Sequence, residues 1–137
     1  MSITDPIADA ITKIRNAYRA QHKTVKVNHS NITEAIIKIL AEENYINSYE
    51  LVEREPEKKI YRKEIFINLR YTNSGKPVLK GIERISKPGL RVYVNSANVP
   101  SVYNNTGCAI LTTNEGVMVD RDARKHHVGG EYVCKVW

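Results

Sequence analysis

The chain has 137 residues, of which 42% are hydrophobic and 26% charged, a composition that is typical of a globular protein and excludes a disordered chain. Its 21 Lys and Arg residues against 15 Asp and Glu give a net charge of +6, which favours a polyanionic partner such as nucleic acid. No segment approaches the roughly 18 apolar residues that cross a bilayer, and the N-terminus lacks the pattern of a signal or transit peptide, so we expect no membrane partner and no targeting segment.

The N-terminal segment predicts an amphipathic helix that begins near Pro6. Asp5 can accept the free amides of a first turn, and proline suits the position after such a cap. Apolar side chains then recur at helical spacing, and the opposite face is basic. The apolar positions are Ile7, Ile11, Ile14 and Tyr18. The alternating "TVKV" that follows predicts a short strand.

The next segments complete an αβαββ pattern. "SNITEAIIKILAEENY" predicts a second helix, in which Asn31 and Glu34 have the spacing of a capping box. "YINSYELV" and "IYRKEIFINLRY" flank a charged connection and predict an antiparallel hairpin. Residues 1–73 are therefore expected to form an N-terminal α/β lobe.

After "TNSGKP" the chain becomes richer in turns, which places the expected lobe boundary there. Short alternating segments joined by Gly, Pro and Asn predict that residues 76–137 form a mostly β lobe. "RDARKHH" predicts a short helix in this lobe, with Asp120 as its cap. The expected fold class is α+β, with an αβαββ lobe followed by a mostly β lobe.

The sequence lacks the residue spacings that are typical of several kinds of enzyme site. Cys108 and Cys134 lie in alternating apolar segments without metal-ligand spacing, so they are expected to be buried hydrophobic residues. The adjacent pair "HH" lacks the spacing that places two imidazoles on one metal ion, and "GGE" is not a phosphate-binding loop. We therefore predict no catalytic residue, metal site, cofactor or small-molecule substrate.

A basic turn favours nucleic-acid binding instead. "ERISKPGLRVY" places Arg84, Lys87 and Arg91 around a Pro-Gly turn, with Tyr93 on the next strand. Cationic groups can neutralise phosphates, and a tyrosine ring can stack on a base or sugar. The alternative is a cationic hairpin whose tyrosine belongs to the core.

Four ordered motifs resemble one family along essentially the whole chain: "DPIADAITKIRNA", "RISKPGLRVY", "TTNEGVMVDRDAR" and "GGEYVC". They are similar to the small-subunit ribosomal protein S8 family of bacteria and plastids. The resemblance implies a two-lobe protein that binds an irregular helix in the central domain of small-subunit ribosomal RNA. It also implies a role in subunit assembly, with other small-subunit ribosomal proteins as neighbours.

The resemblance implies an RNA-binding surface in residues 76–137, supplemented by the first helix. Its expected contacts in the C-terminal lobe are Tyr93, Thr112, Thr113, Asn114, Gly130 and Glu131, and those of the N-terminal lobe are Thr4, Arg15 and Asn16. Glu131 is expected to accept from a base or to position the turn. Lys87 and Arg91 are added as phosphate contacts.

In "TTNEG", short donor and acceptor side chains suit base and ribose edges, and Gly116 allows a tight turn. Asn114 stands where the family commonly has serine. The alternative is that Asn114 only supplies the turn, as asparagine often does where φ is positive.

The ending "CKVW" resembles plastid and cyanobacterial members. With no transit peptide in the sequence, we expect an organelle-encoded protein of chloroplast ribosomes, or otherwise a ribosomal protein of the bacterial cytoplasm. Two other functions remain open: a translational regulator that binds an mRNA mimic of the ribosomal site, and a small RNA-processing enzyme that uses Asp120 or His126.

Overall fold

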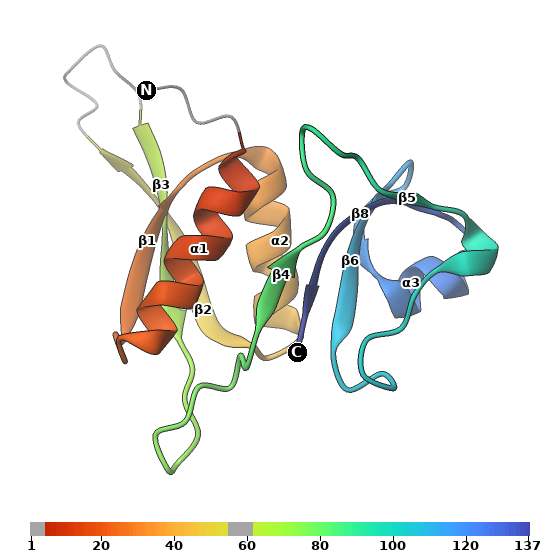
Figure 1. The fold of residues 1–137 in the computed structure, drawn as a ribbon. Helices are drawn as coiled ribbons and strands as arrows, with labels where there is room; N and C mark the ends of the chain where they lie inside the picture. The colour runs from red at the N-terminus through yellow and green to blue at the C-terminus, as the bar shows by residue number, and fades with distance from the viewer. Residues whose placement is uncertain (1–4, 55–61) are drawn as a thin grey trace. The chain divides into compact units, whose positions relative to one another are not determined.

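The structure is a computed structural model that describes residues 5–54 and 62–137. Two compact units are found: residues 6–79 form one, and residues 80–137 together with Asp5 form the other (Figure 1). The first unit holds two helices and a small sheet, and the second holds a larger antiparallel sheet and a short helix, so the predicted α+β class is confirmed. The functional division into residues 1–73 and 76–137 stays a prediction.

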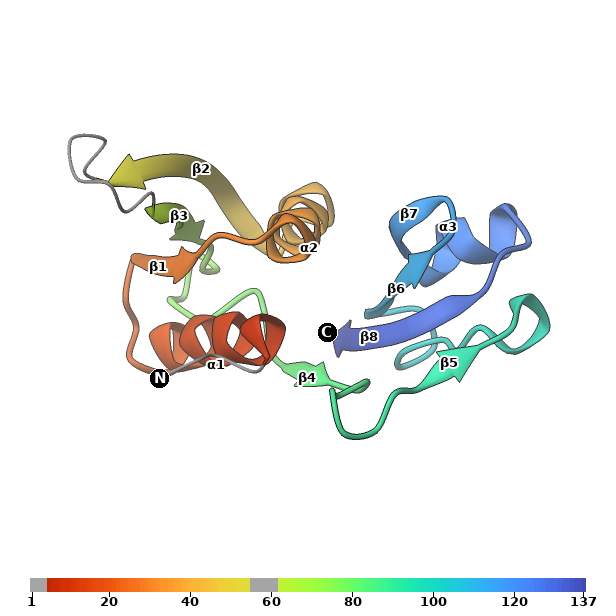
Figure 2. The same ribbon diagram turned by 90° about the horizontal axis from the view of Figure 1, so that it is seen from above.

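Residues 6–79 form a three-stranded antiparallel sheet in the order β1-β3-β2, with two helices packed on it (Figure 2). The elements are α1 (Pro6–Arg19), β1 (Thr24–Asn28), α2 (Asn31–Glu42), β2 (Ile46–Arg54) and β3 (Arg62–Leu69). Helix α1 contacts β1, α2 contacts β2, and the helices contact each other. The predicted apolar face of α1 is buried, and each such side chain contributes roughly 1.5–3 kcal/mol when removed from water.

The predicted capping box of α2 is wrong by one residue. Ser30 is the cap, and its Oγ accepts a hydrogen bond from the Thr33 amide at 3.2 Å, while Asn31 is already the first helical residue. Ser30 has an extended backbone, with φ −147° and ψ 158°, which lets its short side chain reach the amide three positions on.

Residues 80–137 form an antiparallel sheet around its last strand. The elements are β4 (Ile82–Arg84), β5 (Tyr93–Val94), the 3₁₀ turn η1 (Ser96–Asn98), β6 (Cys108–Thr113), β7 (Gly116–Val119), α3 (Asp120–Lys125) and β8 (Gly130–Val136). The strand order is β4-β8-β6-β7, and β5 also pairs with β8. Along β8, β5 therefore pairs with the first residues and β4 with the last.

The predicted role of Asp120 as the cap of α3 is wrong. Asp120 is the first residue of the helix, after Val119, and it is buried. Its carboxylate accepts from the Ala109 amide at 3.2 Å and from Arg124 Nη2 at 2.7 Å. Since the paired register of β7 ends opposite Ile110, Asp120 supplies the acceptor for the next amide of β6.

Both cysteines are free and buried in the C-terminal sheet, which confirms their predicted role as small core residues. Burial raises the pKa of the Cys134 thiol to about 12, so the thiol is protonated at neutral pH. At the end of β8, the rings of Tyr103 and Trp137 meet edge to face with centroids 5.3 Å apart.

Candidate nucleic-acid interface

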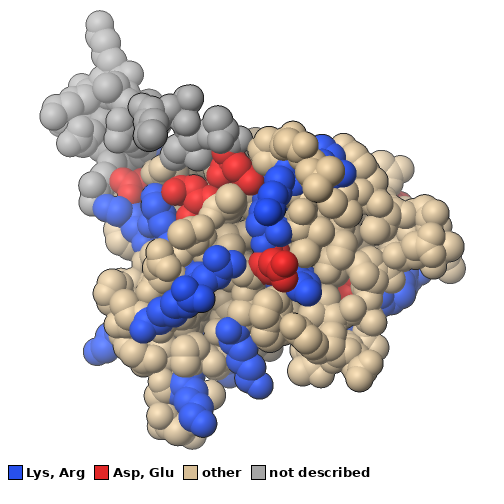
Figure 3. Space-filling model, in the orientation of Figure 1, with Lys and Arg blue, Asp and Glu red and all other residues tan. Residues whose placement is uncertain are grey.

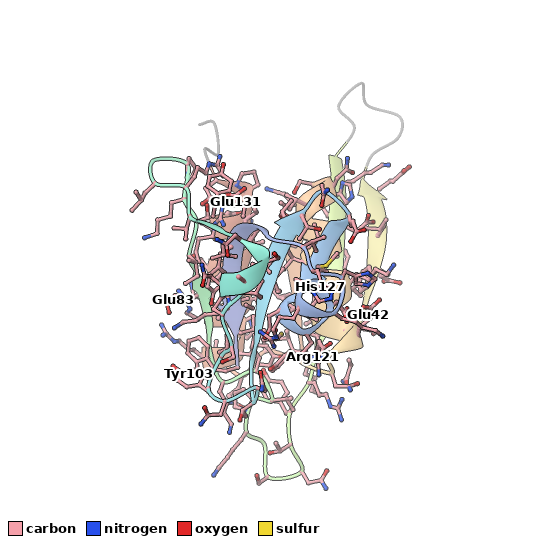
Figure 4. All side chains as sticks on the ribbon, turned by 90° about the vertical axis from the view of Figure 1, so that its right-hand side faces the viewer. Glu42, Glu83, Tyr103, Arg121, His127 and Glu131 are labelled. Carbon is pink, nitrogen blue, oxygen red and sulfur yellow. The ribbon has the colours of Figure 1, made fainter. Side chains whose placement is uncertain are left out.

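Five of the predicted contact residues lie in two adjacent rows across the C-terminal sheet. Glu131 of β8 lies directly opposite Tyr93 of β5 on one side and Thr112 of β6 on the other. In the next row, Gly130 lies between Val94 and Thr113. Directly opposed residues of antiparallel strands project to the same face, so Tyr93, Glu131 and Thr112 are neighbours on one face. Figure 4 shows Glu131 near one end of this sheet.

Tyr93 is not a core residue. Its relative exposure is 70%, and its side chain makes no hydrogen bond, ion pair or ring contact with any residue in 5–54 or 62–137. The core alternative from the sequence is therefore wrong, and the ring is free to stack on a base or sugar.

The carboxylate of Glu131 is held by a network beside Tyr93. One oxygen, Oε2, accepts from Ser86 Oγ at 2.5 Å and from Arg91 Nη1 at 2.9 Å. Ser86 Oγ in turn accepts from the Val92 amide at 3.1 Å. Burial alone would raise the pKa of Glu131, but the bonds from Ser86 and Arg91 and the nearby positive charges outweigh it, and the pKa is lowered. Glu131 is therefore ionised at neutral pH.

The Pro-Gly turn follows Ser86 directly in the chain and runs from Lys87 to Leu90. Lys87 and Leu90 exchange backbone hydrogen bonds of 3.0 and 2.9 Å, which closes the turn. Both side chains are exposed, that of Leu90 to 71%. Lys87 is thus accessible to a phosphate, whereas Arg91 reaches the surface while donating to Glu131.

Arg84, which the sequence grouped with Lys87 and Arg91, faces inward. Its side chain is 8% exposed, and its guanidinium donates to Asp5 Oδ2 at 3.2 Å and to the Val133 carbonyl at 2.8 Å. Arg84 holds the sheet together, so it is not part of the basic surface.

The turn that links β6 to β7 is closed by Thr113. Its hydroxyl donates to the Gly116 carbonyl at 2.9 Å and accepts from the Glu115 amide at 3.1 Å. Gly116 has φ +113°, as expected for the tight turn, whereas Asn114 is not among the described residues with positive φ. The positive-φ alternative for Asn114 is therefore wrong, because the glycine supplies that conformation. Asn114 is exposed at the tip.

Thr112 carries an unsatisfied hydroxyl. Its Oγ1 is the one buried side-chain oxygen or nitrogen without a hydrogen-bond partner in the described part of the chain. Leaving such a group unpaired costs about 1–3 kcal/mol.

Gly130 has a structural reason to be glycine. A Cβ atom placed there would lie 2.1 Å from the Thr112 carbonyl oxygen and 3.0 Å from the Thr113 Cα. The close approach of β8 to β6 at this position therefore leaves no room for a side chain.

Two of the remaining predicted contacts belong to the other unit. Arg15 is half-buried and Asn16 exposed on α1, and Thr4 lies outside the described residues. Lys and Arg side chains cross the surface that α1 forms in Figure 3. The basic face that the sequence predicts for this helix is thus partly accessible.

Ser86 belongs to the network around Glu131, and no sequence pattern predicted this role. This serine is fully buried and bonds to a carboxylate 45 residues later in the chain. No periodicity indicates such a pair. The one signal that could have found it is its place at the end of the alternating "GIERI" segment, two residues after Arg84 and therefore on the same side of the strand.

The described residues contain no group of three or more His, Cys, Asp or Glu side chains that could hold a metal ion. None of the described helices has the length and apolar character needed to cross a membrane.

Comparison with known proteins gives a consistent result. The family model described as "Ribosomal protein S8" matches residues 5–137. The chain is 44% identical over 137 residues to the small ribosomal subunit protein uS8 of Halothermothrix orenii, and 45% identical over 137 residues to that of Mycoplasmopsis synoviae. In both comparisons the match covers 100% of this chain and 100% of the relative. The chain is 46% identical over 134 residues to uS8 of Solibacter usitatus, covering 98% of each chain. The chain therefore belongs to the ribosomal protein S8 family.

Proposed function

We propose that this protein is a structural constituent of the small ribosomal subunit that binds the central domain of its ribosomal RNA and assists assembly. Its role is that of a ribosomal protein and not of an enzyme, in keeping with the names of its relatives. The neighbouring partners are other small-subunit ribosomal proteins.

One observation carries the RNA-binding part of this proposal. Tyr93, Thr112 and Asn114 present an exposed ring, an unsatisfied hydroxyl and an exposed amide at one end of one sheet. Irregular RNA offers unstacked bases and 2′-hydroxyls, which pair with these chemical groups. Because Thr112 as a residue is half-buried, rotation about its χ1 could turn the hydroxyl toward such a partner.

Lys87 and Arg91 contact phosphates of the bound RNA and neutralise their charge. Thr113, Gly130 and Glu131 shape the surface through the contacts described above. Arg15 and Asn16 provide a second contact from α1, together with Thr4.

The test is binding to a central-domain fragment of small-subunit RNA that contains an irregular helix. We expect tight, stoichiometric binding and a hydroxyl-radical footprint on the irregular segment. The control RNA is a fully paired duplex of the same length. Equal affinity for both RNAs would contradict the proposal.

Asn114 provides a sharper version of this test. Serine at this position should keep RNA affinity, since a hydroxyl can replace one amide hydrogen bond. Glycine should weaken binding by about 1–3 kcal/mol while the melting temperature stays nearly constant, because the side chain is exposed. Full affinity of Asn114→Gly would reduce the turn to a strand connection.

The chloroplast location is a further proposal, and it rests on the ending "CKVW". The relatives reported above are bacterial, so the comparison supports a ribosomal location in general. Mass spectrometry of ribosomes purified from chloroplasts of the source organism would detect the protein if the location is correct.

A further inference from the structure

We infer that Glu131 is a specificity-determining residue, which withholds Arg91 from the phosphates of RNA that does not fit the surface. This inference rests on the proposed RNA-binding function and concerns the same face of the sheet. It assigns to Glu131 a task other than direct contact with a base.

The carboxylate of Glu131 already has hydrogen-bond partners within the protein. Its Oε2 accepts from both Ser86 and Arg91, and the carboxylate side chain is only 20% exposed. Ser86 is fully buried and is itself fixed by the Val92 amide. The carboxylate is therefore held in place from within the protein.

The charge of Glu131 also acts on phosphates. A fixed negative charge between Tyr93 and Thr112 opposes the approach of any phosphate to the centre of the row. The same charge holds the Arg91 guanidinium, so a phosphate gains Arg91 only by competing with Glu131.

The effect differs between the two classes of RNA. Non-specific binding derives almost entirely from contacts between cations and phosphates, so it weakens when Arg91 is held by Glu131. A fitting RNA is anchored by its contacts with the ring of Tyr93 and the polar turn, so its phosphate competes with Glu131 for Arg91 at a high local concentration and recovers that contact. An RNA without these anchors does not recover it. Opposing a wrong partner more than the right one raises specificity.

The experiment uses the full chain with the Glu131→Gln substitution. Glutamine can still accept from Ser86 but loses the ion pair with Arg91, so the melting temperature should fall, and binding is measured well below it, where the variant is folded. Dissociation constants are measured over a salt series for the central-domain fragment and for the fully paired duplex. Glu83→Gln is the matched control, because Glu83 pairs with Lys135 at 3.4 Å on the same sheet.

We expect Glu131→Gln to tighten duplex binding by roughly threefold or more and to steepen its salt dependence by about one phosphate contact. Binding of the central-domain fragment should change less, so the preference between the RNAs falls. Adding Arg91→Ala should abolish the gain, and Glu83→Gln should leave both affinities unchanged.

Three results would overturn the inference: equal tightening for both RNAs, an equal gain with Glu83→Gln, or lost affinity for the central-domain fragment alone. The last would make Glu131 a direct RNA ligand. A wild-type protein that does not prefer the central-domain fragment would instead refute the proposed function. In that case the duplex measurements alone still decide whether Glu131 withholds Arg91.

Discussion

Each end of strand β8 has a glutamate in an ion pair and an exposed tyrosine, but the two tyrosines differ in their contacts within the protein. Near its start, Glu131 pairs with Arg91, and Tyr93 is exposed. Near its end, Glu83 of β4 pairs with Lys135, and Tyr103 is 58% exposed. Figure 4 shows Glu131 and Tyr103 toward opposite ends of the sheet.

The difference lies in the partners of each tyrosine. The ring of Tyr103 contacts Trp137, and the Lys135 ammonium lies 5.8 Å from its centroid. Tyr93 has no such neighbour among the residues that the structure describes. An aromatic ring without an internal partner is the better candidate for an external one, which separates a binding surface from a merely exposed end.

The largest expected effect is on stability, from a methyl group added between strands. A Cβ on Gly130 would lie 2.1 Å from the Thr112 carbonyl oxygen, and one on Gly107 would lie 2.3 Å from that of Val136. We expect either alanine variant to lose about 1–3 kcal/mol or more in the free energy of unfolding. Urea denaturation measures this loss. If the two ends differ in function, only Gly130→Ala should also weaken RNA binding of the folded protein, and equal RNA affinities would remove the distinction.

A comparable effect on binding is expected for Tyr93→Ala. Loss of a stacked base should cost about 1–3 kcal/mol of RNA affinity, with little change in the melting temperature because the ring is exposed. Tyr103→Ala is the matched variant: it should lose about 0.5–1.5 kcal/mol of stability from the ring pair and keep its RNA affinity. The reverse pattern, measured by RNA titration and thermal melting, would place the binding surface at the other end.

A smaller effect should separate the two lysines. Lys87→Gln should lower the slope of log affinity against log salt by about one unit without changing base preference. Lys135→Gln should leave the slope unchanged, since Lys135 is engaged with Glu83 and the two rings. A changed base preference for Lys87→Gln would show that this lysine contacts a base.

The thiol of Cys134 should not change the free energy of unfolding with pH near neutrality, but it should do so in alkaline solution. Burial raises its pKa from 9.0 to about 12 in the folded protein. Between these values the unfolded chain holds fewer protons than the folded one, so stability falls as the pH rises from about 9 toward 12. Urea midpoints at a series of pH values should show a shallower decline for Cys134→Ala. The remaining decline should start nearer pH 10, because burial also raises the pKa of Tyr132 from 10.0 to about 12. Identical declines in wild type and variant would exclude the thiol as a cause.

Local patterns predicted the elements well, because helix and strand periods are properties of neighbouring residues. The apolar stripe of α1 and the exposed Asn114 at a turn follow from such patterns. The burial of Arg84 does not, because it depends on Asp5, a residue 79 positions away. The acceptor role of Asp120 toward Ala109 likewise depends on where β7 stops pairing.

The candidate surface shows the same limit. Motifs identified its members, but not which of them use their polar groups inside the protein. Thr113 closes its own turn and Glu131 binds Ser86, while Thr112 is left unsatisfied. These differences depend on which residues of neighbouring strands lie opposite each other, and local sequence patterns do not show this.

Trp137 is the single tryptophan of the sequence, and its packing against Tyr103 makes it a natural optical probe. Its ring also covers Gly81, where an added Cβ would lie 2.2 Å from it, so its emission depends on the folding of residues 80–137. Because it adjoins the end of β8 while the proposed RNA contacts adjoin its start, RNA bound there should leave the emission nearly constant. Folding and binding could then be followed in one sample, through tryptophan emission and the anisotropy of a labelled RNA.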